Sequence, residues 1–119
     1  MRKRAVFAVL VCLCLTACQP LENTARDVIA GAQGFIQQAQ VNHLAECQAN
    51  PTKDFPCQTI NRAVAAQNLA IDALNVYCGF GKDTPAHTPC AANKSGAASL
   101  KAALDNLNRI ISDYKEASK

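Results

Sequence analysis

Three stretches of the chain repeat apolar residues at steps of three and four, which is the spacing of one face of an α-helix. The first stretch predicts a helix from about Thr24 to Cys47, and the second predicts one from about Thr59 to Cys78. The third runs from about Ser95 or Ser99 to Ala117. No segment shows the alternation of a half-buried strand. The pattern therefore predicts an all-α domain.

The three predicted stripes consist of small aliphatic residues with a few aromatic ones. They are Ala25, Val28, Ile29, Ala32, Phe35, Ile36 and Ala39, then Ile60, Ala63, Val64, Ala70, Ile71, Leu74 and Tyr77, then Leu100, Ala103, Leu104, Leu107, Ile110, Ile111 and Tyr114.

Turn-forming residues separate the predicted helices. Residues Gln48 to Pro56 and Gly79 to Lys94 are predicted loops, and Gly79 is placed to end the second helix. Residues Thr24 to Asp27 have the form of a capping box at the start of the first helix, with Asp in place of the usual Glu. Three amphipathic helices joined by two loops predict a small up-down-up three-helix bundle.

The first 18 residues have a different pattern, that of a targeting signal. A basic head, Arg2-Lys3-Arg4, precedes an apolar run from Ala5 to Leu15 and then the sequence Leu15-Thr16-Ala17-Cys18. The run of 11 residues is shorter than the roughly 20 that span a bilayer. Together these features resemble the signal peptide and lipobox of bacterial lipoproteins, with an ordinary secretory signal as the alternative.

The resemblance implies cleavage before Cys18, a diacylglycerol on its thiol and a fatty acid such as palmitate on its new amine. Residues 1–17 would then be the signal peptide, 18–23 a lipidated tether and 24–119 the helical domain. The residue after the lipidated cysteine is Gln19 and not the Asp associated with retention at the inner membrane. By resemblance, the protein is expected at the outer membrane facing the periplasm, if the source has two membranes.

Removal of the signal changes the charge of the chain. The precursor has 12 basic and nine acidic residues, and three of the basic residues lie in the signal. The expected mature chain is therefore neutral, which gives no basic patch for a nucleic-acid partner. With no Trp and few aromatic residues, it suggests no large aromatic pocket, no small-molecule substrate and no cofactor beyond the lipid.

Four cysteines remain in the mature region, an even number typical of two disulfides in an exported domain. Zinc is the alternative, but nine and eleven intervening residues do not match the short spacing of zinc knuckles. In the predicted bundle, the second helix separates its ends by roughly 30 Å, whereas a disulfide needs Cα atoms within about 7 Å. The bundle therefore predicts the pairs Cys47–Cys57 and Cys78–Cys90.

Few residues suggest catalysis. His43 precedes Glu46 by three positions, a spacing at which the two side chains meet on a helix, but one such pair offers too few ligands for a tight metal site. His87 lies in a proline-rich loop without an evident partner. The favoured interpretation is a boundary histidine at position 43, no metal site and no enzymatic activity.

The polar faces of the predicted helices differ in charge. From Val28 to Ala45 the chain has no Asp, Glu, Lys or Arg, and Gln33, Gln37 and Gln40 share one face. Asn61, Asn68 and Asn75 recur every seven residues on the second helix. These amides are either a surface for contact with a partner, ordinary solvated flanks, or Asn residues that fix helix register.

On the third helix, charges of alternating sign recur every four residues. Lys101, Asp105, Arg109 and Asp113 are expected to form a solvated face with weak ion pairs.

The leading hypothesis is a lipid-anchored, non-enzymatic envelope protein that binds another envelope protein. One alternative is a self-associating structural component of the envelope. Another is an exclusion lipoprotein of the kind carried by phages or plasmids, or an inhibitor lipoprotein.

Overall fold

The computed structural model describes residues 20–119, which form α-helices joined by loops and short turns, with no β-strand in this range. The α-helices are α2 (Leu21–Asn42), α3 (Leu44–Ala49), α4 (Thr59–Cys78) and α5 (Ala97–Ala117). A π-type turn, η1 (Asp54–Gln58), and a 3-10 turn, η2 (Lys94–Gly96), precede α4 and α5. The all-α class is confirmed. Cys18 and the predicted signal lie outside the described residues.

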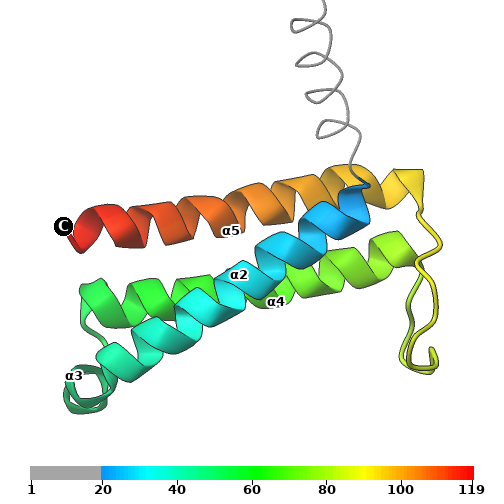
Figure 1. Ribbon diagram of the computed structural model, residues 1–119. Helices are drawn as coiled ribbons and strands as arrows, with labels where there is room; N and C mark the ends of the chain where they lie inside the picture. Colours follow the sequence, from blue (N-terminus) through cyan, green and yellow to red (C-terminus); the bar gives the residue numbers. More distant parts are fainter. Residues whose placement is uncertain (1–19) are drawn as a thin grey trace, which may run out of the picture.

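The long helices α4 and α5 lie side by side and run in opposite directions, and α2 crosses them obliquely (Figure 1). The short helix α3 follows the far end of α2 and lies beside the start of α4. The loop from Gly79 to Asn93 lies at the opposite end of the molecule (Figure 1).

The predicted first helix is wrong in its start and in its continuity. Helix α2 begins at Leu21 directly after Pro20, so Leu21 to Asn23 are helical and do not belong to a tether. Thr24 therefore lies within the first turn, where Arg26 pairs with Glu22 at 3.0 Å, and no side chain caps the helix. The helix also ends at Asn42, and a single residue, His43, separates it from α3, which begins at Leu44.

Helix α4 has the predicted bounds. Gly79 ends it in the left-handed conformation with φ of 72°, which a residue without Cβ adopts readily. The amide of Gly79 donates to the carbonyl of Val76, and that of Phe80 donates to Asn75. These two bonds form a Schellman motif, which satisfies carbonyls that the end of a helix leaves open.

The loop after α4 returns along the end of that helix. The amides of Ala91 and Asn93 donate to the carbonyls of Cys78 and Tyr77. Gly96 passes so close that an added Cβ would lie 3.2 Å from the Cα of Tyr77. The start of α5 is therefore held directly against the end of α4.

The main core is made of small aliphatic residues from all three long helices. Leu100 and Leu107 are fully buried, and Ala25, Ala32, Ala66, Ala70, Leu74, Cys78 and Leu104 complete the cluster. Every stripe residue predicted for α2 and α5 is buried or partly buried. On α4 the prediction is wrong for Ile71, which is 36% exposed because it lies at the edge of the stripe, where its neighbours cover it incompletely.

Both disulfides have the predicted partners. Cys47 joins Cys57, and Cys78 joins Cys90, with Cα–Cα distances of 5.5 and 4.4 Å. The first bond ties α3 to the turn before α4, and the second ties the end of α4 to the returning loop. In the chain-entropy description, each contributes on the order of 2–3 kcal/mol.

Candidate functional site

The predicted contact residues of α2 lie on its surface. Gln33, Gln37 and Gln40 are all exposed. Arg26 belongs to the same side of the helix because it precedes Gln33 by seven residues, or about two turns. Neighbouring Gln38 is also exposed, and its amide donates to Asn42 one turn further along.

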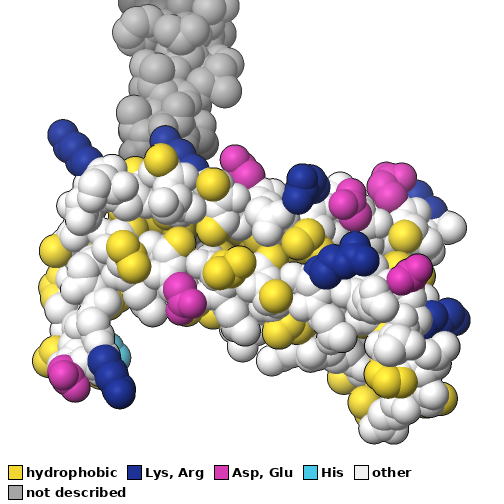
Figure 2. All heavy atoms as spheres, turned by 180° about the vertical axis from the view of Figure 1, so that it is seen from behind, with side chains coloured by type: hydrophobic (Ala, Val, Ile, Leu, Met, Phe, Trp, Pro, Cys, Tyr) yellow, Lys and Arg dark blue, Asp and Glu magenta, His cyan; other side chains and the backbone are white. Residues whose placement is uncertain are grey.

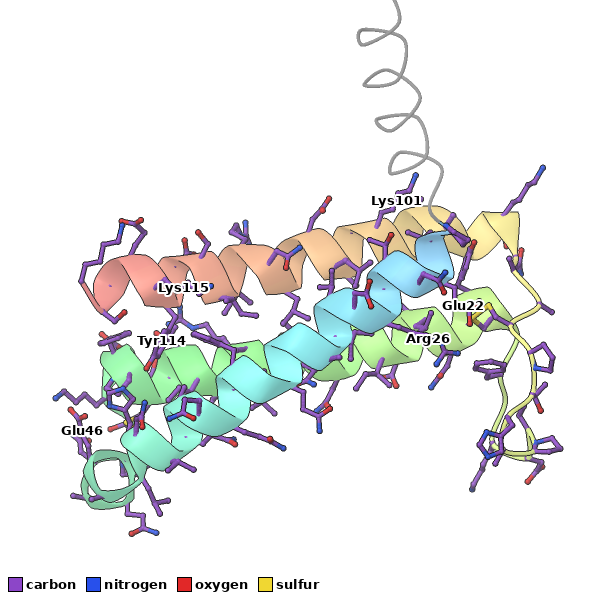
Figure 3. All side chains as sticks on the ribbon, viewed as in Figure 1. Glu22, Arg26, Glu46, Lys101, Tyr114 and Lys115 are labelled. Carbon is purple, nitrogen blue, oxygen red and sulfur yellow. A yellow bond between two sulfur atoms is a disulfide. The ribbon has the colours of Figure 1, made fainter. Side chains whose placement is uncertain are left out.

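The asparagine row of α4 is also exposed, and it borders the same side of α2. Gln40 and Asn61 line one hollow of the surface, whereas Arg26 and Asn75 line another. Figure 3 labels Arg26 near the end of α2 that lies over the last turns of α4. Because each hollow joins the same face of α2 to the same face of α4, the two amide rows flank one boundary between the helices. We call this surface the amide seam: Gln33, Gln37, Gln40, Asn61, Asn68 and Asn75.

The hollow at the α3 end of the seam is an open groove of about 400 Å³. Its lining is largely apolar, with the side chain of Leu44 56% exposed and that of Ile60 buried. The lining residues are Gln40, Leu44, Cys47, Gln48, Pro51, Cys57, Ile60 and Asn61. This groove offers a place for an apolar side chain beside the uncharged amides.

A polar network lies at the same end of the molecule. His43 at the break after α2 contacts the Tyr114 hydroxyl of α5 through Nε2 at 2.8 Å, and Glu46 of α3 through Nδ1 at 3.3 Å. Lys53 binds the other carboxylate oxygen of Glu46. The ring of His43 thus connects the break in the helix to both α3 and α5.

Aromatic rings surround the network. Phe35 meets Tyr114 edge to face with ring centroids 5.0 Å apart, and Phe55 lies 5.2 Å from the same ring. The ammonium of Lys115 lies 5.6 Å from the centroid of the Phe35 ring. Figure 3 labels Lys115 and Tyr114, which are neighbours on α5. These contacts fix the position of Tyr114, which is 9% exposed.

The surroundings alter the acidity of two groups. The hydrogen bond from Lys53, and then that from His43, lower the pKa of Glu46. Burial raises the pKa of Tyr114, and the negative charge of Glu46 adds to the effect. At neutral pH, Glu46 is therefore a carboxylate and Tyr114 a neutral hydroxyl.

This network is not arranged to hold a metal ion. The Nε2 of His43 already contacts Tyr114, and the Glu46 carboxylate is shared by His43 and Lys53. A structural zinc site takes four nitrogen, sulfur or oxygen ligands, which one histidine and one engaged carboxylate do not supply. The geometry instead supports the expected boundary histidine.

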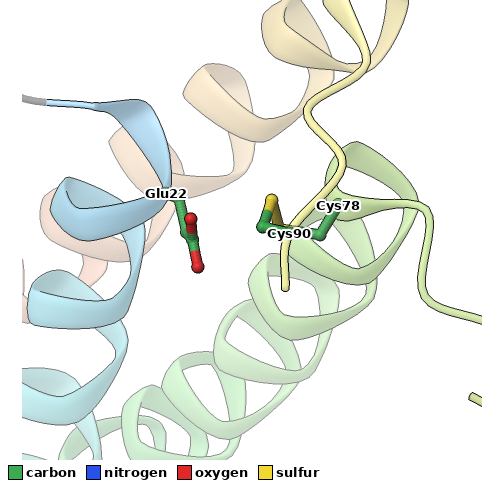
Figure 4. A group of neighbouring side chains, drawn as sticks. All are labelled: Glu22, Cys78 and Cys90. Carbon is green, nitrogen blue, oxygen red and sulfur yellow. A yellow bond between two sulfur atoms is a disulfide. The ribbon is translucent and has the colours of Figure 1, made fainter. Parts of the chain in front are cut away.

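A second group with metal-ligand atoms lies at the other end of the molecule. Glu22 comes within 4.8 Å of the sulfurs of Cys78 and Cys90 (Figure 4). Both sulfurs belong to the disulfide, so neither is the thiolate that a metal requires. This group has no free sulfur ligand.

The charge ladder expected on α5 does not form ion pairs. Lys101, Asp105, Arg109 and Asp113 are exposed, and no two of them come within 4.0 Å. Arg109 instead donates to the side chain of Asn106 at 2.9 Å. The face is solvated as expected, but its charges point into water.

Comparison with known protein families, with curated proteins and with solved structures finds no match to this chain. In the described part of the chain, no helix has both the length and the apolar character that crossing a bilayer requires.

Sequence reasoning identified the two amide rows but missed their common boundary, the groove beside the disulfide and the contact of His43 with Tyr114. The groove is signalled only weakly, by Leu44 at a position outside the predicted stripe. The contact joins residues 71 positions apart, which a local pattern does not reveal.

Proposed function

We propose that this chain is a lipid-anchored protein of the bacterial cell envelope, which binds another protein through the amide seam. The anchor is the lipid on Cys18 that the lipobox resemblance implies. In this proposal α2, α4 and α5 act as an up-down-up three-helix unit, and the protein has no catalytic role. Gln19 favours the outer membrane as its site in a two-membrane cell.

One observation carries the choice of the binding surface: exposed amides from two helices flank a single boundary that ends in an apolar groove. Removing amides from water costs less than removing charges, so this face is less costly to cover than the charged face of α5. The charged face of α5 would lose more hydration. A partner that fits the seam presents uncharged polar groups and inserts an apolar side chain between Leu44 and Ile60.

The anchor is tested by metabolic labelling of the full-length chain with a fatty acid. The Cys18→Ser variant is expected to incorporate no label, whereas the wild-type chain does. Because all four disulfide cysteines remain, this variant keeps the folded domain. Undiminished labelling without Cys18 would disprove the proposed anchor.

The binding surface is tested by replacing Gln37 with a photo-crosslinking amino acid in the full-length protein in its own cells. A single cross-linked product with another envelope protein is expected, whose identity mass spectrometry then provides. The matched control carries the same amino acid at Arg109, an exposed position on α5, and is expected to give little of this product. A product with twice the mass of the chain would assign the seam to self-association.

The identified partner then allows a quantitative test. Gln37→Lys introduces a charge into the seam while Lys remains a good helix former, so binding should weaken at least tenfold with an unchanged circular dichroism spectrum. Arg109→Glu is expected to bind as the wild type does. Equal binding by Gln37→Lys and wild type would show that the seam is only a solvated surface.

A further inference from the structure

Helix α4 carries a second regular stripe on its solvent side. Arg62, Ala65, Leu69, Asp72 and Val76 follow one another at steps of three and four, which is the spacing of the contact positions in a coiled coil. All five are exposed, and the large apolar members Leu69 and Val76 are 60% and 64% exposed. We call these five residues the outer stripe.

The outer stripe is distinct from the core and from the amide seam. At about 100° of rotation per residue, its members occupy a narrow arc on the side of α4 opposite the buried Ala63, Ala70 and Leu74. The asparagines that border α2 lie between these two arcs. Figure 2, which views the molecule from the side opposite to Figure 1, shows apolar side chains at the surface along the packed helices. Within residues 20–119, no other element covers Leu69 or Val76.

The order of residues in the outer stripe makes it complementary to itself in one orientation. We propose that two copies of the protein pair through α4 in an antiparallel arrangement centred on position 67. Arg62 of each copy then faces Asp72 of the other, and Leu69 of each faces Ala65 of the other. Both pairs are centred on position 67, so one two-fold axis relates the two copies. Because each pair then occurs twice, the axis produces four contacts.

Size and charge both favour this register. A large Leu opposite a small Ala allows two helices to approach closely and interlock. In a parallel pair in register, Arg62 would face Arg62 and Asp72 would face Asp72, and these like charges would repel each other. The charged pairs therefore choose the antiparallel orientation, and burial of Leu69 against Ala65 supplies the attraction.

Lipid anchoring, where it occurs, is compatible with this dimer. A two-fold axis keeps equivalent atoms of the two copies at the same height along the axis. Both anchors therefore reach the same bilayer when the axis is perpendicular to it. Asn61, Asn68 and Asn75 directly precede Arg62, Leu69 and Val76, so the α4 contact adjoins the asparagine row of each amide seam.

A charge-swap experiment tests the register. The full-length protein in detergent is analysed by analytical ultracentrifugation over a range of concentrations. The wild type is expected to dimerise, and Arg62→Asp should weaken dimerisation at least tenfold because it places Asp opposite Asp72. The double variant Arg62→Asp with Asp72→Arg restores opposite charges and should dimerise as the wild type does.

The matched control is Arg109→Asp, which makes the same change at an exposed position of α5 outside the stripe and should leave dimerisation unchanged. Circular dichroism verifies that each variant is folded. A wild type that stays monomeric throughout would overturn the proposal. It would also fail if Arg62→Asp leaves dimerisation unchanged, or if the double variant does not recover it. Stronger dimerisation of Arg62→Asp would exclude the antiparallel register.

Discussion

The two packed clusters of the molecule are built on different chemistry. The main core is aliphatic, contains Leu100 and Leu107 at 0% exposure, and includes the buried Cys78. The other cluster, which we call the aromatic end, consists of Ala39, Ile60 and Tyr114 with the partly buried Phe35 and Phe55. It also holds the His43 network and adjoins the open groove.

The difference separates stability from recognition. Aliphatic packing is non-directional, and it stabilises the folded state by removing apolar surface from water. The aromatic end instead fixes the direction of α3 by directed contacts, and it leaves a groove and exposed amides beside them. The core should therefore determine whether the chain folds, and the aromatic end should determine the shape of the surface it presents.

The largest expected effect belongs to the main core. Leu107→Ala removes a fully buried side chain and leaves a cavity, so the free energy of unfolding should fall by about 2–5 kcal/mol. Urea unfolding followed by circular dichroism measures the change. Leu44→Ala is the control, because its side chain is exposed at the groove and should change stability by no more than about 0.5 kcal/mol. If both variants lose the same free energy of unfolding, the main core does not determine stability more than the groove does.

A smaller effect is expected at the aromatic end. Tyr114→Phe keeps the ring packing but removes the hydroxyl that contacts His43, at a cost of about 1 kcal/mol. Burial raises the pKa of Tyr114, so its neutral form stabilises the folded state. That contribution is fully present below the ordinary tyrosine pKa of about 10 and is lost as pH rises through the raised value.

The Tyr114→Phe variant has no hydroxyl to ionise. Its free energy of unfolding should therefore fall less at alkaline pH than that of the wild type. Urea unfolding at neutral and alkaline pH measures both changes. If the change from neutral to alkaline pH lowers the free energy of unfolding equally in the variant and the wild type, ionisation of the hydroxyl is not coupled to folding.

The smallest expected effect distinguishes the two disulfides. Reduction proceeds through a thiolate, and the carboxylate of Glu22 beside the sulfurs of Cys78 and Cys90 should repel it. Cys47 and Cys57 line the open groove, so their bond should be reduced several-fold faster by a limiting dithiol. Alkylation and mass spectrometry at successive times measure the two rates.

Glu22→Gln removes the repelling charge, and high salt screens it. Either change should bring the reduction rate of Cys78–Cys90 closer to that of Cys47–Cys57. Faster reduction of Cys78–Cys90 in the wild type would contradict the argument.

The features predicted correctly from sequence are those with local causes. The bounds of α4 follow from Pro56 before it and Gly79 after it, and the disulfide pairs follow from the positions of cysteines at helix ends. The exposure of Gln33, Gln37 and Gln40 follows from their position beside the apolar stripe of α2 and outside it.

The features that the sequence did not predict depend on distant contacts or on water. No Gly or Pro marks the break at His43, whose ring is held by a residue of α5 and by another of α3. The charged residues of α5 have the right spacing for ion pairs. Because their charged groups are exposed, water stabilises them about as well as an ion pair would. The groove depends on the path of α3, which in turn depends on that break.

The early start of α2 limits how far the domain can stand from a bilayer. If Cys18 carries the lipid, only two residues separate it from the first helical residue, Leu21. Three extended residue steps span about 10 Å, and the 22 residues of α2 span about 33 Å along their axis. The groove at the far end of α2 would then lie within roughly 45 Å of the lipid surface, so a partner must itself approach the membrane to reach it.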